Sequence, residues 1–136
     1  MRLETRARAR ALQALYAWEL RGESDLRGVA ERIWDDLRVS PDERRMAGVL
    51  VRAVEAHRDA LDGEITAVTT NWRLDRLGVI DRCVLRLAAA EMQYGVAPVR
   101  VVIQEAVRLA ERFGSEESAR FVNGVLDAVA RRIGKL

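Results

Sequence analysis

The chain of 136 residues is 49% hydrophobic and 32% charged, which is the balance of a folded globular domain. Its nine glycines and two prolines are too few for the many turns of a β-sandwich or barrel. No apolar run approaches the roughly 18 residues that a membrane span needs, and the first ten residues do not lead into a secretory signal. The single cysteine, Cys83, has no partner for an internal disulfide. We therefore expect a cytoplasmic protein without a membrane partner.

The net charge is only +2, but the basic residues are unusual in kind and in place. All 23 except Lys135 are arginine. A GC-rich genome favours arginine codons, so the positions of the arginines are more informative than their number. Residues 1–10 hold four arginines and one glutamate, residues 11–70 hold eight basic and twelve acidic residues, and residues 71–136 hold eleven and eight. The chain has a basic start and a mildly basic second half.

Helical periodicity dominates the first half of the chain. A first helix is predicted over residues 4–21, with Gly22 as its C-terminal cap and one apolar face. Ser24 or Asp25 can cap a second helix that extends to about residue 37. The clearest start is Ser40-Pro41-Asp42-Glu43, which places a capping serine before a helix over residues 40–61. The apolar face of the first helix consists of Leu3, Ala7, Ala11, Ala14, Leu15 and Trp18.

The second half continues the same pattern after a break at residues 74–78. Helices are predicted over residues 63–72, 80–94, 98–114 and 115–134, and no segment alternates like a strand. The sequence therefore predicts an all-α fold of about seven short helices. Seven helices exceed a simple four-helix bundle, so we expect one domain over residues 1–136 that is made of two packed small bundles, residues 1–62 and 63–136.

Residues that could support catalysis are scarce. The only histidine, His57, lies in the middle of a predicted helix, and Cys83 lies one turn from Ile80 on an apolar face. The chain has no metal-binding or phosphate-binding motif of the common kinds. We expect no catalytic residues, no metal site and no cofactor, and therefore a protein that is not an enzyme.

The first helix carries a basic face next to an aromatic residue. Arg2, Arg6, Arg10 and Gln13 lie within about 80° of one another on a helical wheel, and Tyr16 lies at the edge of this stripe. Guanidinium groups for phosphates and a ring for stacking are the two parts that single-stranded RNA binding uses. A solvated helix face with a half-buried Tyr16 is an equally good interpretation.

The last helix has two further features. Arg120 and Phe121 follow its cap, although Phe121 is more often a core residue at such a position. Gly124 stands in mid-helix, where glycine costs about 1 kcal/mol relative to alanine. Close approach of another helix or of a ligand would explain this glycine.

Three stretches of the sequence resemble the NusB family of bacterial transcription antitermination factors. They run in the family's order and span most of the chain, and the C-terminal stretch is the most specific. The stretches are Arg8-Ala9-Arg10-Ala11-Leu12-Gln13-Ala14-Leu15-Tyr16-Ala17-Trp18-Glu19, Leu74-Asp75-Arg76-Leu77-Gly78-Val79-Ile80-Asp81-Arg82, and Arg112-Phe113-Gly114-Ser115-Glu116-Glu117-Ser118 with Phe121-Val122-Asn123-Gly124-Val125-Leu126-Asp127.

The resemblance implies an all-α, two-bundle fold and a role in binding the boxA element of nascent ribosomal RNA. It implies two partners, the small-subunit ribosomal protein called NusE in this role and the RNA polymerase antitermination complex. With the basic face, it gives the candidate RNA-binding residues Arg6, Arg8, Arg10, Gln13, Tyr16, Glu117, Arg120 and Phe121. The candidate NusE-binding residues are Arg76, Asp81 and Arg82. One departure is that the first arginines alternate with alanine, whereas many relatives carry a contiguous basic run.

Two alternatives remain open from the sequence. The chain could be a homodimeric helical protein–protein interaction module whose RNA binding is incidental, since a dimer could cover the arginine face. It could also be the NusB-like domain of an RNA-modifying methyltransferase, which would need a Gly-rich cofactor domain after Leu136.

Overall fold

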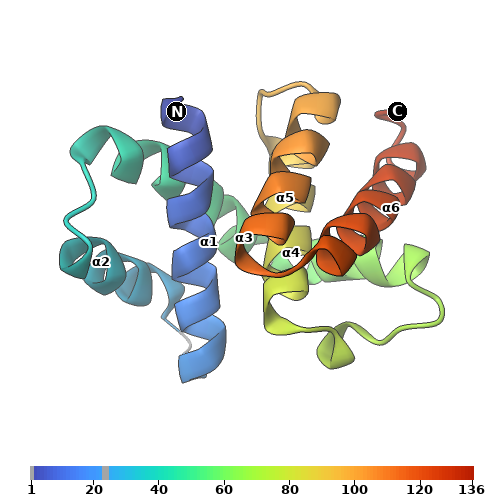
Figure 1. The fold of residues 1–136 in the computed structure, drawn as a ribbon, viewed down its shortest axis with the longest axis horizontal. Coiled ribbons are helices and arrows are strands. Elements are labelled where there is room, and N and C mark those ends of the chain that lie inside the picture. Colours follow the sequence, from blue (N-terminus) through green and yellow to red (C-terminus); the bar gives the residue numbers. More distant parts are fainter. Residues whose placement is uncertain (1, 23–24) are drawn as a thin grey trace.

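The structure, a computed structural model, describes residues 2–22 and 25–136 and is all-α (Figure 1). The predicted all-α fold is confirmed, and the described residues form six α-helices and one short 3₁₀ turn. These elements are α1 (Leu3–Arg21), α2 (Leu26–Asp36), α3 (Pro41–Val68), η1 (Leu74–Arg76), α4 (Val79–Tyr94), α5 (Val99–Phe113) and α6 (Glu116–Arg132).

The helix ends follow the predicted local signals. Gly22 ends α1 in the left-handed conformation with φ of 65°, which glycine adopts without strain. Ser40 caps α3, where the Glu43 backbone N–H donates to the Ser40 hydroxyl at 3.3 Å. Asp25 caps α2, whereas Ser24 lies outside the described residues.

The middle of the chain differs from the prediction. The helix expected over residues 40–61 and the first part of the one expected over residues 63–72 lie in one element, α3, of 28 residues, and residues 69–72 are not helical. Gly63 does not end it, and the only non-helical residue inside it is His57 with φ of −124° and ψ of 20°. The helix resumes after this kink because Leu61 and Ile65 are both fully buried and hold the second segment against the core.

Helix α3 joins the two halves of the molecule. In Figure 1, α1 stands between α2 on one side and α5 on the other, and α6 lies beyond α5. Helices α1 and α2 pack together and against α3, while α4, α5 and α6 pack together. Helices α4 and α6 also contact α3, and α1 contacts α4. The boundary expected near residues 62–74 therefore falls in the second segment of α3, after the kink at His57, and in the connection that follows it.

The core contains mostly small and branched apolar side chains. Ala7, Ala11 and Ala14 of α1 are fully buried, which lets neighbouring helices approach closely. Some apolar side chains lie outside the core, among them the exposed Leu20 and Leu37 at the ends of α1 and α2. Within the described residues, no helix is both long and apolar enough to cross a membrane.

Gly124 has no packing explanation within the described part of the chain. A Cβ atom built at this position meets nothing within 4 Å. The close approach of another helix, one of the two explanations considered above, is therefore not what the fold provides.

Candidate nucleic-acid interface

The basic face of α1 is exposed and partly balanced by one carboxylate from α3. Arg6 and Arg10 approach Glu43 Oε1 with their Nε atoms at 3.8 and 3.3 Å, and Arg10 Nη1 donates to Gln13 Oε1 at 3.2 Å. Arg2 lies further out, with its side chain 79% exposed. Arg10 and Gln13 are thus held in one orientation, and the face keeps a net positive charge.

Glu43 stays ionised although it is buried. Burial alone would raise the pKa of this carboxyl, but the hydrogen bond from Ser40 and the contacts with Arg10 and Arg6 outweigh it and lower the pKa. The ionised carboxylate fixes the basic face of α1 against the start of α3.

Arg8 lies on the opposite side of α1 from this face. Its guanidinium donates to both carboxylate oxygens of Glu91 on α4, with Nε–Oε1 at 2.8 Å and Nη2–Oε2 at 2.7 Å. Nη1 donates to Glu105 Oε1 of α5 at 3.0 Å, and Thr5 Oγ1 donates to the same oxygen at 2.5 Å. Arg8 is only 7% exposed. These contacts, the bond to Glu91 foremost, raise its pKa despite burial, so it remains charged.

The alternating spacing explains this placement of Arg8. Residues four apart lie on one side of a helix, so Arg6 and Arg10 share a face. Residue 8 lies half a turn away and points into the protein. The resemblance implied an RNA contact for Arg8, but all three of its nitrogens are bound to carboxylates in the interior.

Tyr16 lines an apolar groove beside the basic face. The groove has a volume of about 650 Å³ and lies between α1, the end of α2 and the start of α4. Tyr16 is 36% exposed, and Leu20 and Leu37 add exposed apolar surface. Ile80 and Phe113 complete the wall. A lining of this kind suits the flat face of an unpaired base.

The C-terminal candidates lie on the first two turns of α6. Ser115 caps the helix by accepting from the Ser118 backbone N–H at 3.0 Å. Glu117 and Arg120 are exposed, and Phe121 is half-buried. The edge of Phe121 contacts Trp72, with ring centroids 6.4 Å apart. Trp72 is 60% exposed. It was not among the candidate binding residues predicted from the sequence, although its place next to Arg73 in a short connection was a signal for one.

The three candidate partner-binding residues are arranged differently from one another. Arg76 is exposed on η1. Asp81 lies in the first turn of α4, and its Oδ1 atom is buried with no hydrogen-bond partner among the described residues. Arg82 turns inward instead of facing solvent.

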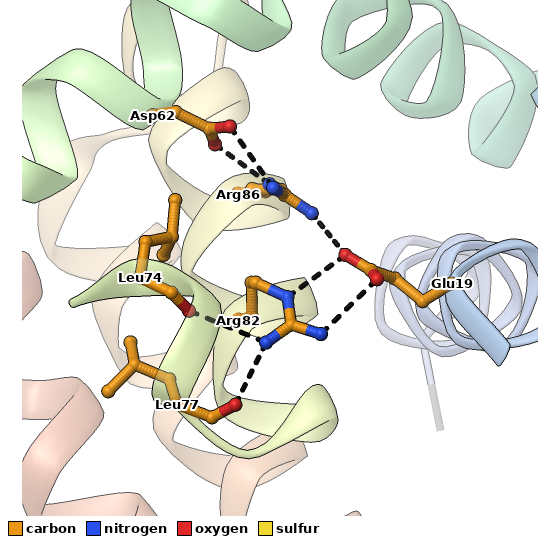
Figure 2. A network of polar contacts seen from close by, with 6 residues as sticks. All are labelled: Glu19, Asp62, Leu74, Leu77, Arg82 and Arg86. Atoms are coloured by element: carbon orange, nitrogen blue, oxygen red, sulfur yellow. Dashed lines mark hydrogen bonds and ion pairs between the residues drawn. The ribbon is translucent and has the colours of Figure 1, made fainter. Parts of the chain in front are cut away.

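Arg82 belongs to a polar network that joins three helices (Figure 2). Its Nε and Nη2 atoms donate to Glu19 of α1 at 3.0 and 3.2 Å, and Nη1 donates to the Leu77 carbonyl at 2.8 Å. Arg86 bridges Glu19 and Asp62 of α3, with Nε–Oδ1 at 2.8 Å. The hydrogen bond from Arg82, with the Arg86 contacts, lowers the pKa of Glu19 against the effect of burial. This network fixes the end of α1 and the η1 segment.

The Tyr16 groove brings the two candidate sets together. Ile80 lines this groove and is the neighbour of Asp81 in the first turn of α4. The candidate RNA face and the candidate partner face therefore adjoin.

Groups that usually support catalysis are used in packing. The His57 ring stacks on Tyr94 at 3.7 Å. Cys83 is buried, and burial raises the pKa of its thiol to about 12. The described ranges hold no group of three or more histidine, cysteine or acidic residues that could bind a metal ion.

Comparisons with known proteins point to one family. The model of the NusB family matches residues 5–131. The transcription antitermination protein NusB of Anaeromyxobacter dehalogenans (strain 2CP-1 / ATCC BAA-258) is 50% identical over 129 residues, which are 93% of this chain and 89% of that protein.

Two solved structures are also similar. One is T. maritima NusB, with a TM-score of 0.87, 35% identity and coverage of 94% of this chain and 90% of that one. The other comes from a crystal structure of antitermination factors NusB and NusE in complex with dsRNA. It has a TM-score of 0.87, 30% identity and coverage of 97% of this chain and 98% of that one.

Proposed function

The chain belongs to the NusB family, and from this premise we propose that it is an RNA-binding transcription antitermination factor. It binds the boxA element of nascent ribosomal RNA together with NusE and helps RNA polymerase read through terminators. It acts in the cytoplasm by binding and not by catalysis. The observation that carries the proposal is the exposed basic face of α1 beside the groove lined by Tyr16.

The RNA-binding residues divide into contacting and positioning groups. Arg6 and Arg10 bind phosphates, Gln13 hydrogen-bonds a base edge, and Tyr16 stacks a base over the groove. Arg8 does not touch RNA; its bonds to Glu91 and Glu105 set the orientation of α1.

The start of α6 contributes the second part of the RNA surface. Arg120 binds a phosphate, and Phe121 with Trp72 offers a partly exposed aromatic pair. Glu117 borders this surface and accepts a hydrogen bond from a base amino group.

NusE binds beside the RNA, at η1 and the start of α4. Arg76 is exposed there, and Asp81 lies in the adjoining first turn of α4. Arg82 positions η1 through the Leu77 carbonyl. Because the two faces adjoin, boxA RNA and NusE raise each other's affinity by the same factor.

A fluorescence-anisotropy titration tests this function. A boxA RNA and a scrambled RNA of equal length are titrated with and without NusE at two salt concentrations. We expect preference for boxA, sharpened by NusE, and affinity that falls with salt. Equal binding of both RNAs that vanishes at moderate salt would contradict a specific role.

Variants locate the site in the same assay. Arg10→Gln and Tyr16→Ala should weaken boxA binding, whereas Arg27→Gln, an exposed arginine on α2, serves as the matched control. Asp81→Asn should weaken NusE binding in preference to RNA binding. Far-UV circular dichroism checks that each variant keeps its helicity. Parental boxA affinity in both RNA variants would show that the site is misplaced.

Self-association is the second candidate function. The exposed Tyr16, Leu20 and Leu37 around the groove of about 650 Å³ favour it, because apolar groups of this kind are also found at interfaces between subunits. Measuring the mass in solution with and without RNA distinguishes the two. A tight dimer that RNA does not dissociate would favour the interaction module.

A further inference from the structure

A second row of polar side chains runs along the outer side of α5. Arg100, Gln104, Arg108 and Arg112 stand at intervals of four residues, and all four are exposed. Side chains spaced in this way share one side of a helix. At a rise of 1.5 Å per residue, the row is about 18 Å long.

Grooves flank this row on both sides. The groove between α5 and α6 has a volume of about 660 Å³ and an apolar floor that includes Ile103 and Val107. Arg120, Asn123 and Asp127 form its α6 side. A groove of about 520 Å³ between α1 and α5 is lined by a larger set: Arg2, Thr5, Arg8, Glu105, Arg108, Leu109 and Arg112.

Arg108 makes the two grooves one continuous strip. It lines both of them, and α1, α5 and α6 follow one another across the same face of the molecule (Figure 1). One end of the strip reaches Arg2 next to the basic face of α1. The other end reaches Arg120, which the proposed function already assigns to RNA.

The carboxylates near the strip are engaged by other groups. Asp127 accepts from Arg131 Nε at 2.9 Å. Glu105 is bound by Arg8 at 3.0 Å, and its second oxygen lies 3.6 Å from Arg108. Arg100 and Arg120 form no ion pair with any residue in the described part of the chain. Arg100 and Arg120 therefore present guanidinium groups that no carboxylate of the described residues pairs, while Arg108 is paired only loosely, at 3.6 Å.

We propose that this strip binds the single-stranded RNA that flanks boxA, an inference that rests on the proposed function. Arg100, Arg108 and Arg112 bind successive phosphates, because a guanidinium fork matches a phosphate. Gln104 and Asn123 carry both donors and acceptors, which suit base edges. The apolar floor takes the faces of unstacked bases. RNA is favoured over an acidic protein segment because the strip is continuous with Arg120 of the proposed RNA surface.

The test compares two RNAs and two double variants. The RNAs are boxA alone and boxA with single-stranded flanks on both sides, and a scrambled RNA is included. Arg100→Gln/Arg108→Gln removes two charges from the strip. Arg45→Gln/Arg52→Gln removes two exposed charges from the α2/α3 groove and is the matched control. Circular dichroism verifies the fold of both double variants.

We expect the flanks to increase the affinity of the wild type and to steepen its salt dependence. The strip variant should lose that gain, and its slope of log affinity against log salt should fall by about 1.4, since each phosphate contact on a single strand contributes about 0.7. Its binding to boxA alone should stay within a few-fold of the wild type, and the control variant should keep the gain.

Each contrary result has a distinct meaning. If the wild type prefers boxA but the strip and control variants bind flanked RNA equally well, the inference is wrong while the proposed function stands. If the strip variant keeps RNA binding and loses NusE binding, the strip contacts a protein and the RNA assignment is overturned. If the wild type does not distinguish boxA from scrambled RNA, the proposed function itself fails.

Discussion

Arg8 shows how a difference of two positions changes the role of a residue. Arg6 and Arg10 face solvent and Glu43, whereas Arg8 is buried between two carboxylates of other helices. A buried ion pair gains its Coulomb energy in a low-dielectric surrounding but loses the hydration of both charges. Removing one partner is costly because the other charges remain buried.

Replacement of Arg8 should therefore be strongly destabilising. Arg8→Ala leaves Glu91 without its cation and Glu105 with only Arg108 at 3.6 Å, and we expect the free energy of unfolding to fall by about 3–5 kcal/mol. Urea denaturation followed by circular dichroism measures this change. Arg2→Ala, on the exposed side of the same helix, should change stability by less than about 0.5 kcal/mol. Similar small losses in both variants would contradict the structural role of Arg8.

Glu19 should make the stability of the folded protein depend on pH in the acid range. The pKa of Glu19 in the folded protein lies below its ordinary value of 4.5. Its stabilising contribution is therefore fully present above that value and is lost as the pH falls through the folded pKa. We expect the free energy of unfolding to decline as the pH drops below about 4.5.

The Glu19→Gln variant isolates this contribution. It should be less stable than the wild type near neutral pH, and its acid decline should be shallower because one shifted carboxyl is gone. Glu43, whose pKa is also lowered, remains and keeps part of the decline. Urea denaturation at a series of pH values provides the measurement, and an unchanged acid decline would disprove this role for Glu19.

At the scale of elements, α6 carries an exposed glycine, and no neighbouring helix of the described residues packs close enough to require it. Gly124 lies in the helix interior, and an added Cβ atom meets nothing within 4 Å among the described residues. Gly63 in α3 has the same open surroundings. These two positions form a matched pair because only one of them lies next to the proposed RNA surface.

Alanine at either position should stabilise the folded protein. We expect Gly124→Ala and Gly63→Ala each to raise the free energy of unfolding by about 0.5–1 kcal/mol, because alanine has the higher helix propensity. If a ligand approaches α6 closely, Gly124→Ala alone should also weaken RNA binding. Thermal denaturation and the anisotropy titration measure the two effects. Destabilisation by Gly124→Ala would contradict the open surroundings.

At the scale of the whole molecule, α3 and the Glu19 network tie the two halves together. Helix α3 runs through both groups of helices, and Arg86 connects α1 and α3 to α4. The predicted single domain of residues 1–136 should therefore unfold as one unit, and its division into two sub-bundles stays a prediction.

Probes in different halves test this cooperativity. Trp34 is buried in the first half and Trp72 is exposed in the second. We expect a variant that keeps Trp34 with Trp18 and Trp72 replaced by phenylalanine to unfold at the same urea concentration by fluorescence and by circular dichroism. A second variant that keeps Trp72 and has Trp18 and Trp34 replaced by phenylalanine should also show the same midpoint by both methods. Separate midpoints would mean that the sub-bundles are independent domains.

Much of this molecule follows from the sequence. The apolar periodicity determines the all-α class, and Gly22, Ser40 and Ser115 determine helix ends, because capping bonds and periodic faces depend on residues only a few positions apart. The row of Arg6, Arg10 and Gln13 was predictable for the same reason. The row along α5 could have been read from its four-residue spacing.

Other properties were decided only by the tertiary structure. The partners of Arg8 are 83 and 97 residues away in the chain, and Arg82 meets Glu19 across 63 residues. Whether α3 stops near Gly63 depends on the burial of Leu61 and Ile65 against other helices. Local pattern thus determined which segments are helical and which faces are basic, whereas long-range packing decided which arginines are buried with carboxylates and which remain on the surface.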